Sequence, residues 1–377
     1  MSTTASTKTH RKPKFTGSNA FRKELMRRAN EFFEEQGIEK RGHEDMYLKT
    51  AIILLWVALS YGLVVFATIP WYVRGVAIVS LGFAMAGVGF NIMHDAGHRA
   101  YSNNKRLNRL MFFSVDLMGA SSYIWITKHN VYHHTYANIE GVDNDLEAGD
   151  LARFSPHQPH YWFHRFQHIY LLPLYGFMSF RWVFVRDQIN WFMRRTGPHP
   201  IPEPSTGEKV IFWTGKAGFI TLAFVIPSLV NPFWQVVLCY ALVAYFQGFM
   251  LAIIFQLAHV VDVADFPLPD EDTNELPMGW AEHQLATTMD FAPNNPFVTW
   301  YSGGLNFQAI HHLFPNITHV HYPELRKIVM EVCEEFEVPY LCAPTFRAAV
   351  LSHLRCLKEM GRAPEAAGVA LEPAAAE

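Results

Sequence analysis

Charged residues are scarce in this chain. Asp, Glu, Lys and Arg together make up 17% of its 377 residues, whereas hydrophobic residues make up 50%. Ordinary soluble domains carry more charge and less apolar sequence, so this balance favours a membrane protein. The formal net charge of −3 gives no reason to expect a nucleic-acid-binding function.

Cysteine is scarce as well, and several common signals are missing. The four cysteines include no CxxC pair, which argues against a disulfide framework and a cysteine-based zinc site. They are Cys239, Cys333, Cys342 and Cys356. The N-terminal stretch MSTTASTKTHRKPKF has no apolar run, so no secretory signal peptide is expected. The segment GHEDM at residues 42–46 lacks the second histidine of HExxH, and a zinc protease is not supported.

Long apolar runs, by contrast, are present. Residues 50–69 and 75–93 contain no charged side chain, and each run is long enough for a helix that crosses about 30 Å of hydrocarbon. The short segment PWYVR between them predicts a tight turn, and therefore a helical hairpin. Residues 217–261 form a second uncharged region, broken in its middle by two prolines, which predicts a second hairpin.

Other segments combine apolar and charged residues and are expected at the membrane surface. Lys216 lies near the start of the third predicted helix, where its long side chain can reach the surface. Residues 107–126 and 169–193 contain charged side chains, so we interpret both as lying in the interface rather than spanning it. Residues 21–36 have the pattern of an amphipathic helix that rests on the cytoplasmic surface.

Basic residues orient the chain. They are concentrated in residues 1–49, and Arg74 is the one in the two short turns, so the N-terminus is predicted to be cytoplasmic. The predicted divisions are a cytoplasmic N-terminal segment (1–47), hairpin 1 (48–93), a cytoplasmic or interfacial block (94–209), hairpin 2 (210–258), a second cytoplasmic block (259–360) and a disordered tail (361–377). The sequence thus predicts an all-α integral membrane protein with four transmembrane helices.

Histidines gather in three short motifs, here called boxes one, two and three. Box one is His94 and His98, box two is His129, His133 and His134, and box three is Gln308, His311 and His312, while His259 ends the fourth predicted helix. A spacing of four places two imidazoles on one helix face. Because each hairpin returns the chain to the cytoplasmic side, the boxes are predicted to meet there, within a helical cap.

These motifs predict a metal site. Imidazole suits iron, zinc, copper or nickel, and a single zinc ion takes three or four protein ligands, so eight clustered histidines indicate two metal ions. Asp95 is a candidate partner for the N–H group of a ligand. The acidic run at residues 143–147 is interpreted as a solvated loop. His319 and His321 are expected to support the loop of box three, and the role of His283 stays open.

The motifs HDxxH, HxxxHH and QxxHH in this order resemble the membrane fatty-acid desaturases. The phrases KHNVYHH, TTMDFAPNNP and WYSGGLNFQAIHHLFP are especially similar to cyanobacterial-type acyl-lipid delta-6 desaturases. The resemblance implies a di-iron centre and implies as its ligands His94, His98, His129, His133, His134, His259, His311 and His312. Gln308 stands where other desaturases have a further histidine, and whether it binds metal directly or through water is open.

The resemblance also implies an activity. The expected reaction is an O2-dependent, front-end desaturation of an unsaturated C18 acyl chain such as linoleoyl, in a membrane lipid or in acyl-CoA. No HPGG haem motif is present, so a separate donor, ferredoxin or a cytochrome b5-like protein, is expected to supply two electrons. Lys128 is a candidate for head-group binding, and Trp125, Trp300 and Phe314 are candidates to shape an acyl tunnel.

Alternative functions stay open at this point. A di-iron lipid hydroxylase or a desaturase of another regiospecificity would carry the same motifs. A metal transporter is the alternative of a different class, although transporters place their ligands near the bilayer midplane. The expected location is a bacterial cytoplasmic or thylakoid-type membrane, with the active site on the cytoplasmic side.

Overall fold

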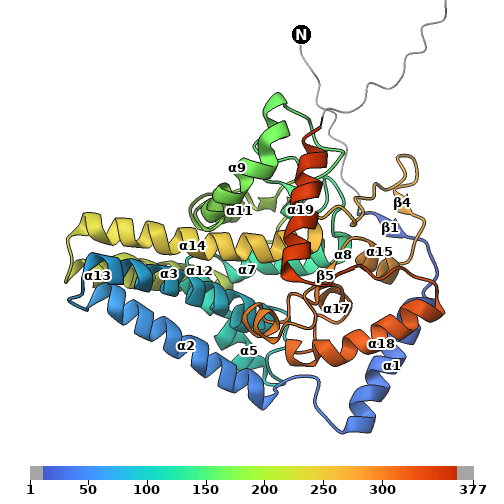
Figure 1. The fold of residues 1–377 in the computed structure, drawn as a ribbon. Coiled ribbons are helices and arrows are strands. Elements are labelled where there is room, and N and C mark those ends of the chain that lie inside the picture. The colour runs from blue at the N-terminus through green and yellow to red at the C-terminus, as the bar shows by residue number, and fades with distance from the viewer. Residues whose placement is uncertain (1–11, 363–377) are drawn as a thin grey trace, which may run out of the picture.

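The computed structural model describes residues 12–362 and is mostly helical (Figure 1). The tail predicted to be disordered lies outside the described residues, except for residues 361 and 362. The described strands are two-residue pairs: β1 (Lys14–Phe15) with β4 (Glu275–Leu276), β2 (Arg195–Thr196) with β3 (His199–Pro200), and β5 (Asp290–Phe291) with β6 (Cys342–Ala343).

Four helical segments of the described chain are long and apolar enough to cross a membrane, as predicted. They are Glu44–Val65 (α2), Trp71–Gly97 (α3, Trp71–Val88; η1, Gly89–Met93; α4, His94–Gly97), Thr206–Ser228 (α12, Thr206–Ile220; η7, Thr221–Val225; α13, Ile226–Ser228) and Phe233–His259 (α14). Figure 1 shows them side by side in one half of the molecule. A bend of 107° separates the helices at Lys105–Leu117 and Ser122–Tyr136, which would add a fifth crossing only as a broken or re-entrant span.

Helix α14 packs closely against its neighbours through glycines. A Cβ atom added to Gly82 of α3 would lie 2.7 Å from the Cβ atom of Phe246 and 2.9 Å from the carbonyl oxygen of Val243. A Cβ atom on Gly248 would lie 2.7 Å from the carbonyl oxygen of Gly176. Small residues are typical of close helix contacts in membranes, where backbones approach without a hydrophobic driving force.

The expected role of Lys216 is wrong. Because α12 begins at Thr206, Lys216 lies inside the helix rather than near its start. Its ammonium group donates to the carbonyl oxygens of Gly119 and Ala120. The side chain therefore joins the third helix to the turn before box two instead of extending to the membrane surface.

The segment between the second and third spans is a series of short helices. They are α5 (Lys105–Phe112), α6 (Ser114–Leu117), α7 (Ser122–Trp125), η2 (Ile126–His133), α8 (His134–Tyr136), η3 (Asn144–Leu146), η4 (Trp162–Phe166), α9 (Gln167–Leu174), η5 (Tyr175–Phe177), α10 (Met178–Phe180), η6 (Arg181–Arg186) and α11 (Asp187–Met193). Residues 166–193 expose many large apolar side chains, as expected of a segment in the membrane interface.

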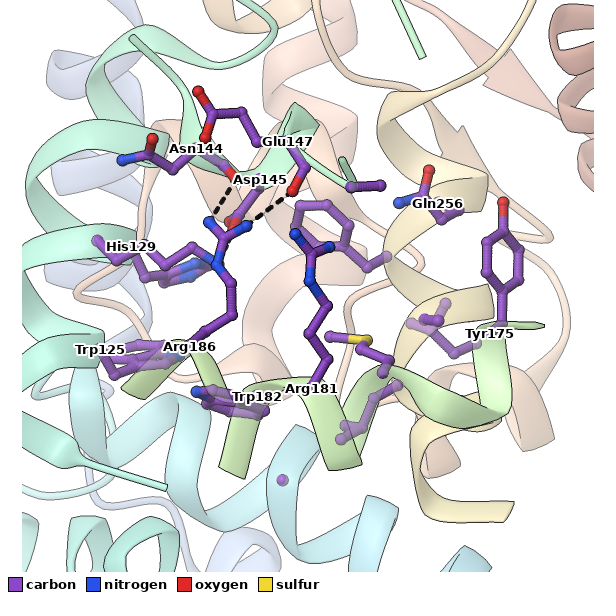
Figure 2. Close-up of a pocket in the computed structure, with 18 of the residues that line it drawn as sticks. Trp125, His129, Asn144, Asp145, Glu147, Tyr175, Arg181, Trp182, Arg186 and Gln256 are labelled. Carbon is purple, nitrogen blue, oxygen red and sulfur yellow. Dashed lines mark hydrogen bonds and ion pairs between the residues drawn. The ribbon is translucent and has the colours of Figure 1, made fainter. Parts of the chain in front are cut away.

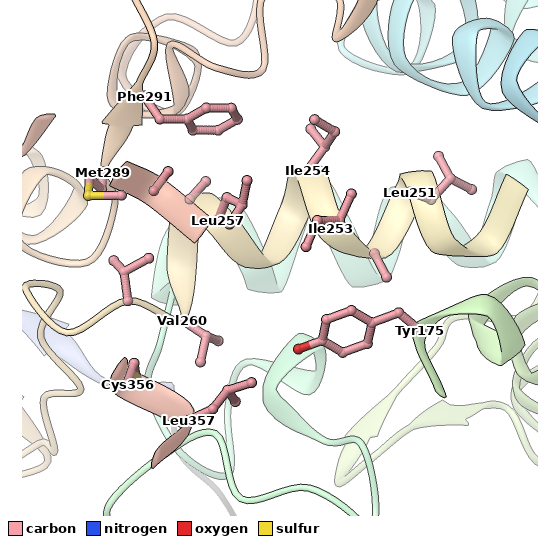
Figure 3. Packing of buried hydrophobic residues seen from close by; sticks show 14 of the residues in the cluster. Tyr175, Leu251, Ile253, Ile254, Leu257, Val260, Met289, Phe291, Cys356 and Leu357 are labelled. Carbon is pink, nitrogen blue, oxygen red and sulfur yellow. The ribbon is translucent and has the colours of Figure 1, made fainter. Parts of the chain in front are cut away.

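The remaining helices form a cap beyond the ends of the spans. They are α1 (Ala20–Gln36), α15 (Trp280–Ala286), α16 (Pro296–Tyr301), α17 (Gln308–Leu313), η8 (His319–His321), α18 (Tyr322–Glu335) and α19 (Phe346–Met360). The end of α14 enters this cap, where Leu257 and Val260 pack with Phe291 and Leu357 (Figure 3). This core fixes the position of His259, the last residue of α14.

Helix α1 forms where the amphipathic pattern predicts it, but its apolar face packs against the protein instead of being free to contact a membrane. Its buried side chains, Phe21, Leu25, Ala29 and Phe33, belong to one core with side chains of α15, α17 and α18. The periodicity correctly identified the apolar face, and the protein itself covers that face. The N-terminal segment is therefore part of the cap.

Candidate metal centre

The structure brings together all nine residues of the three boxes and His259. Their side chains are buried, with exposed fractions of 0–8%. They come from α4 and the residue after it, η2, α8, the end of α14, and α17. Segments separated by more than two hundred residues thus meet in one interior site.

The first group of nitrogens comes from all three boxes. The side chains of His94, His98, His129 and His311 offer ligand atoms that all lie within 4.8 Å of one another. His134 adjoins this group, because its Nε2 atom lies 3.2 Å from Nε2 of His129 and 3.0 Å from Nε2 of His311. Two nitrogens that bind one ion at about 2.1 Å and at right angles would lie about 3 Å apart.

The second group lies beside the first. His133, His259 and His312 also offer ligand atoms within 4.8 Å of one another. The amide nitrogen of Gln308 lies 3.0 Å from Nε2 of His259, so this side chain belongs to the second group. The rings of His134 and His312 stack with centroids 4.4 Å apart, which makes the two groups immediate neighbours.

The unsatisfied nitrogens fit bound cations. Within residues 12–362, the buried Nε2 atoms of His98, His133 and His312 have no hydrogen-bond partner. Buried polar atoms without partners are costly, and a metal ion would satisfy these three. Burial lowers the pKa of both His311 and His312, so these imidazoles stay neutral, as metal ligands must be.

Three polar residues orient the imidazoles through hydrogen-bond contacts with their Nδ1 atoms. Nδ1 of His133 lies 3.0 Å from the carboxylate of Asp143, and Nδ1 of His312 lies 2.7 Å from the amide oxygen of Gln284. Nδ1 of His311 lies 3.1 Å from the hydroxyl oxygen of Tyr322. Such partners fix the ring and direct Nε2 toward the metal.

The interpretation of residues 143–147 as a solvated loop is wrong. Asp143 is 2% exposed, and Asp145 lies close enough to His129 and His133 to form a third group of possible ligands. Asp145 also forms an ion pair with Lys128, so the ammonium group proposed for head-group binding already has a carboxylate partner. The sequence did offer one hint of this role: metal-bound histidines commonly bond to carboxylates, and this acidic run follows box two closely.

The expected role of Asp95 is also wrong. Its carboxylate accepts from the hydroxyl of Thr318 at 3.0 Å and faces Nδ1 of His319 at 2.9 Å, instead of bonding to a box imidazole. The ammonium group of Lys49 lies 2.9 Å from Nε2 of His319. This buried chain links α2, box one and the loop after box three, which confirms the supporting role predicted for His319.

Two π-helical turns carry the boxes. Gly89–Met93 (η1) leads directly into box one, and Ile126–His133 (η2) contains most of box two. The i→i+5 hydrogen bonds of a π-helix shift the side chains that follow relative to an α-helix, and such turns are frequent at functional sites. The prediction of ordinary helices missed them, because spacing alone does not distinguish the two helix types.

A cavity of about 360 Å³ adjoins the histidines (Figure 2). His94, His129 and Gln308 form part of its wall, and Trp125 lies beside them, stacked on His129 with ring centroids 4.4 Å apart. The apolar part of the wall includes Leu171, Leu174, Phe177, Met178, Leu251 and Ile254. Trp125 therefore shapes the cavity as expected, whereas Trp300 and Phe314 belong to the surrounding packing.

Comparisons with known proteins agree with this geometry. The sequence model of the fatty acid desaturase family matches residues 69–344. The chain is 40% identical to an sn-1 linoleoyl-lipid 6-desaturase from Arthrospira platensis, over 95% of this chain and 97% of that protein. It is 39% identical to a protein of the same name from Synechocystis sp., over 93% and 98% of the two chains. It is 38% identical to an acyl-lipid (8-3)-desaturase from Physcomitrium patens, over 89% and 71%.

Proposed function

Since the chain belongs to the fatty acid desaturase family, and is thus an oxidoreductase that desaturates fatty acyl chains, we propose that it acts on linoleoyl groups of membrane lipids at the delta-6 position. The observation that carries this proposal is the similarity to two sn-1 linoleoyl-lipid 6-desaturases over nearly the whole length of each protein. The reaction would consume O2, two electrons and two protons, and would yield a cis alkene and two waters.

The metal ions in this proposal are two irons. His94, His98, His129, His134 and His311 would hold one iron, and His133, His259 and His312 would hold the other. Gln308 lies beside His259 and would contribute directly or through a water. Bound iron would supply the redox chemistry needed to remove hydrogen from unactivated methylene groups, which side-chain acid–base chemistry lacks. The supporting observations are the division of ligand atoms into two groups and the unsatisfied Nε2 atoms.

The chain's own residues would position the substrate and exclude water. The apolar cavity wall would hold an acyl chain beside His94 and His129, and the indole of Trp125 would limit its path. Hydrogen bonds to Asp143, Gln284 and Tyr322 would keep three imidazoles in fixed orientations before substrate arrives.

The proposed membrane arrangement has two helical hairpins that leave the centre on the cytoplasmic side. The division at residues 47, 93, 209, 258 and 360 belongs to this proposal. The boxes lie at the ends of the spans and within the cap, whereas a metal transporter would place its ligands near mid-membrane. Electrons would come from a separate carrier such as ferredoxin or a cytochrome b5-like protein.

Expression in a host fed linoleate tests the activity. Mass spectrometry of the fatty acids should show a triene two hydrogens lighter than linoleate, with the new double bond at carbon 6. A product heavier by one oxygen would instead identify a hydroxylase, and a triene with another bond position would contradict the delta-6 assignment. Metal uptake without any lipid change would favour a transporter.

Single substitutions test the ligands. His133→Ala should abolish the triene and lower the iron content of the purified protein, while the protein still inserts into membranes. Gln308→Ala should reduce activity less severely, since the three imidazoles of the second group remain and only the amide beside His259 is lost. Normal turnover of the His133→Ala enzyme would contradict the ligand assignment.

A further inference from the structure

The cavity beside the histidines contains two neighbouring arginines. Arg181 and Arg186 are the first and last residues of the π-helical turn η6, and both line the cavity. Because π-helical bonds connect residues five positions apart, this turn places the two side chains on the same side. Figure 2 shows both guanidinium groups extending in the same direction, between Trp125 and His129 on one side and Gln256 and Tyr175 on the other.

The two arginines differ in their partners. Arg186 donates to the main-chain carbonyl oxygens of Glu147, at 2.8 Å, and Asn144, at 3.4 Å. Within residues 12–362, Arg181 forms no hydrogen bond or ion pair, although Glu147 lies near enough to attract it. Arg181 is partly exposed at the mouth of the cavity, and partial desolvation, together with repulsion by Arg186, lowers its pKa. A guanidinium group left with its donors free beside a second one favours an anion.

The acidic groups of the same cavity leave this cation available. Asp145 forms its ion pair with Lys128, and the carboxylate of Glu147 attracts Arg181 without forming a hydrogen bond or ion pair with it. Asp187 is buried, and burial raises the pKa of its carboxyl group to about 7. Arg181 therefore has free hydrogen-bond donors in the cavity. It, rather than Lys128, is the candidate for head-group binding.

The surface around the arginines has the character of a segment at the membrane interface. Residues around Arg181 expose large apolar side chains, and these include Ile169, Phe177, Met178, Phe184, Val185 and Ile189. Such a surface is typical of a segment embedded in the membrane interface. A lipid that entered the cavity from this side would place its acyl chain against the apolar wall and its head group at the guanidinium groups.

We propose that Arg181, assisted by Arg186, binds a phosphate oxygen of the substrate's head group and thereby positions the acyl chain for reaction near its carboxyl end. This inference rests on the proposed function. Two C18 chains end to end fill a hydrocarbon layer of about 30 Å, so six carbons span only about 5 Å. A desaturase that acts at carbon 6 must therefore hold the head group close to its metal ligands, in the same cavity. Phospholipids carry this phosphate on the glycerol next to the ester, and acyl-CoA carries its phosphates at the far end of the pantetheine arm.

The test compares three linoleoyl substrates in nanodiscs or detergent: linoleoyl phosphatidylglycerol, linoleoyl-CoA and a neutral linoleoyl galactolipid. Wild-type, Arg181→Gln, Arg181→Lys and Arg195→Gln enzymes are assayed with reduced ferredoxin, or with reduced cytochrome b5 where that supports wild-type turnover. Arg195 is an exposed arginine outside the cavity wall and serves as the matched control. Iron content is measured for each preparation.

For the substrate that carries the phosphate, Arg181→Gln should raise KM roughly tenfold to a hundredfold with kcat nearly unchanged, because a charge-assisted hydrogen bond is lost. Arg181→Lys should restore part of that loss, and Arg195→Gln should leave KM unchanged. A larger effect on the phospholipid or on the CoA ester identifies the phosphate source, and either supports the inference.

Equal effects of Arg181→Gln on all three substrates, or no effect on any, would overturn the inference while the wild-type triene leaves the proposed function intact. A larger effect on the galactolipid would overturn it as well, since that head group has no phosphate. Absence of triene from the wild-type enzyme on every substrate would overturn the proposed function and this inference together.

Discussion

Asp143 and Asp95 are both buried carboxylates near the histidines, but Asp143 orients a box imidazole, whereas Asp95 holds two segments of the chain together. Asp143 bonds to His133, whose other ring nitrogen faces the second group of nitrogens. Asp95 bonds to Thr318 and His319 and so connects helix α4 to the loop after box three. Residues of one type, at similar depth, thus act on metal geometry in one case and on chain packing in the other.

Replacing Asp143 by Asn should lower metal affinity. The substitution keeps the size of the side chain but removes the negative charge that holds Nδ1–H of His133. Loss of such a partner typically costs 10- to 100-fold in metal affinity or activity. Iron content by mass spectrometry and triene yield in expressing cells measure the effect. Asp272→Asn, at an exposed position, is the control, and wild-type iron content in the Asp143→Asn protein would refute this role.

His353 should make the stability of the folded protein depend on pH. It is fully buried, its Nδ1 donates to the carbonyl oxygen of Val260 at 2.6 Å, and its Nε2 accepts from the hydroxyl of Tyr175 at 2.7 Å. Burial lowers its pKa to about 4. The unfolded chain binds a proton near pH 6.5, whereas the folded chain does not, so stability should fall as pH drops from about 6.5 to about 4.

The size of this effect is at most on the order of 3 kcal/mol for one histidine. Thermal unfolding in detergent between pH 7.5 and 5 measures it, with His353→Gln compared with the wild type. The variant should lose less stability on acidification, because one buried proton-binding group is gone. His157→Gln, at an exposed histidine, should keep the wild-type pH dependence. Parallel pH curves for wild type and His353→Gln would exclude His353 as a contributor.

At the level of the element, the sequence predicts what depends on composition and period. Charge-free runs located the four long helices, and histidine spacing identified the residues that meet in the centre. The π-helical turns η1 and η2 could not be predicted, because their sequences do not differ in pattern from α-helices. The pairing of His133 with Asp143 was also beyond prediction, since it depends on how the intervening turn folds.

Helix α1 shows the same limit of prediction from sequence, and its packing can be tested. Its apolar face is evident in the sequence, but the surface that covers it depends on the whole cap. Leu25 is fully buried against the core that includes Leu325 and Val329 of α18. Leu25→Ala should therefore destabilise the protein by about 2–5 kcal/mol, as cavity-forming substitutions do. Leu351→Ala, at an exposed position of helix α19, should cost much less.

The melting temperature in detergent distinguishes two roles for α1. The helix could pack within the cap, or it could rest on the lipid surface. A packed helix predicts a lower melting temperature for Leu25→Ala with normal membrane association. A helix that rested on the lipid surface would instead show an unchanged melting temperature and weaker association of the isolated N-terminal segment. The buried core of α1 and α18 favours the first result.

At the scale of the whole molecule, the metal centre exists only if two distant blocks share one side of the membrane. Asn138, from the first block, donates to the carbonyl oxygen of His259 at 2.9 Å and to that of Thr287 at 3.3 Å. These bonds, together with the mixed origin of both nitrogen groups, require that the blocks fold as one cap. The first and second groups of nitrogens each draw on both blocks.

Labelling of single cysteines with a membrane-impermeant maleimide tests this arrangement, after Cys239 and Cys342 are replaced by Ser. Leu151→Cys and Lys327→Cys probe exposed positions of the two blocks, and Trp71→Cys and Leu229→Cys probe the short turns at the opposite ends of the spans. The turn positions should react in intact bacterial cells, and the block positions only after lysis, if the basic N-terminus and both blocks lie in the cytoplasm as we propose from the positive-inside rule. If Leu151→Cys and Lys327→Cys reacted from opposite sides, boxes two and three could not share a metal centre.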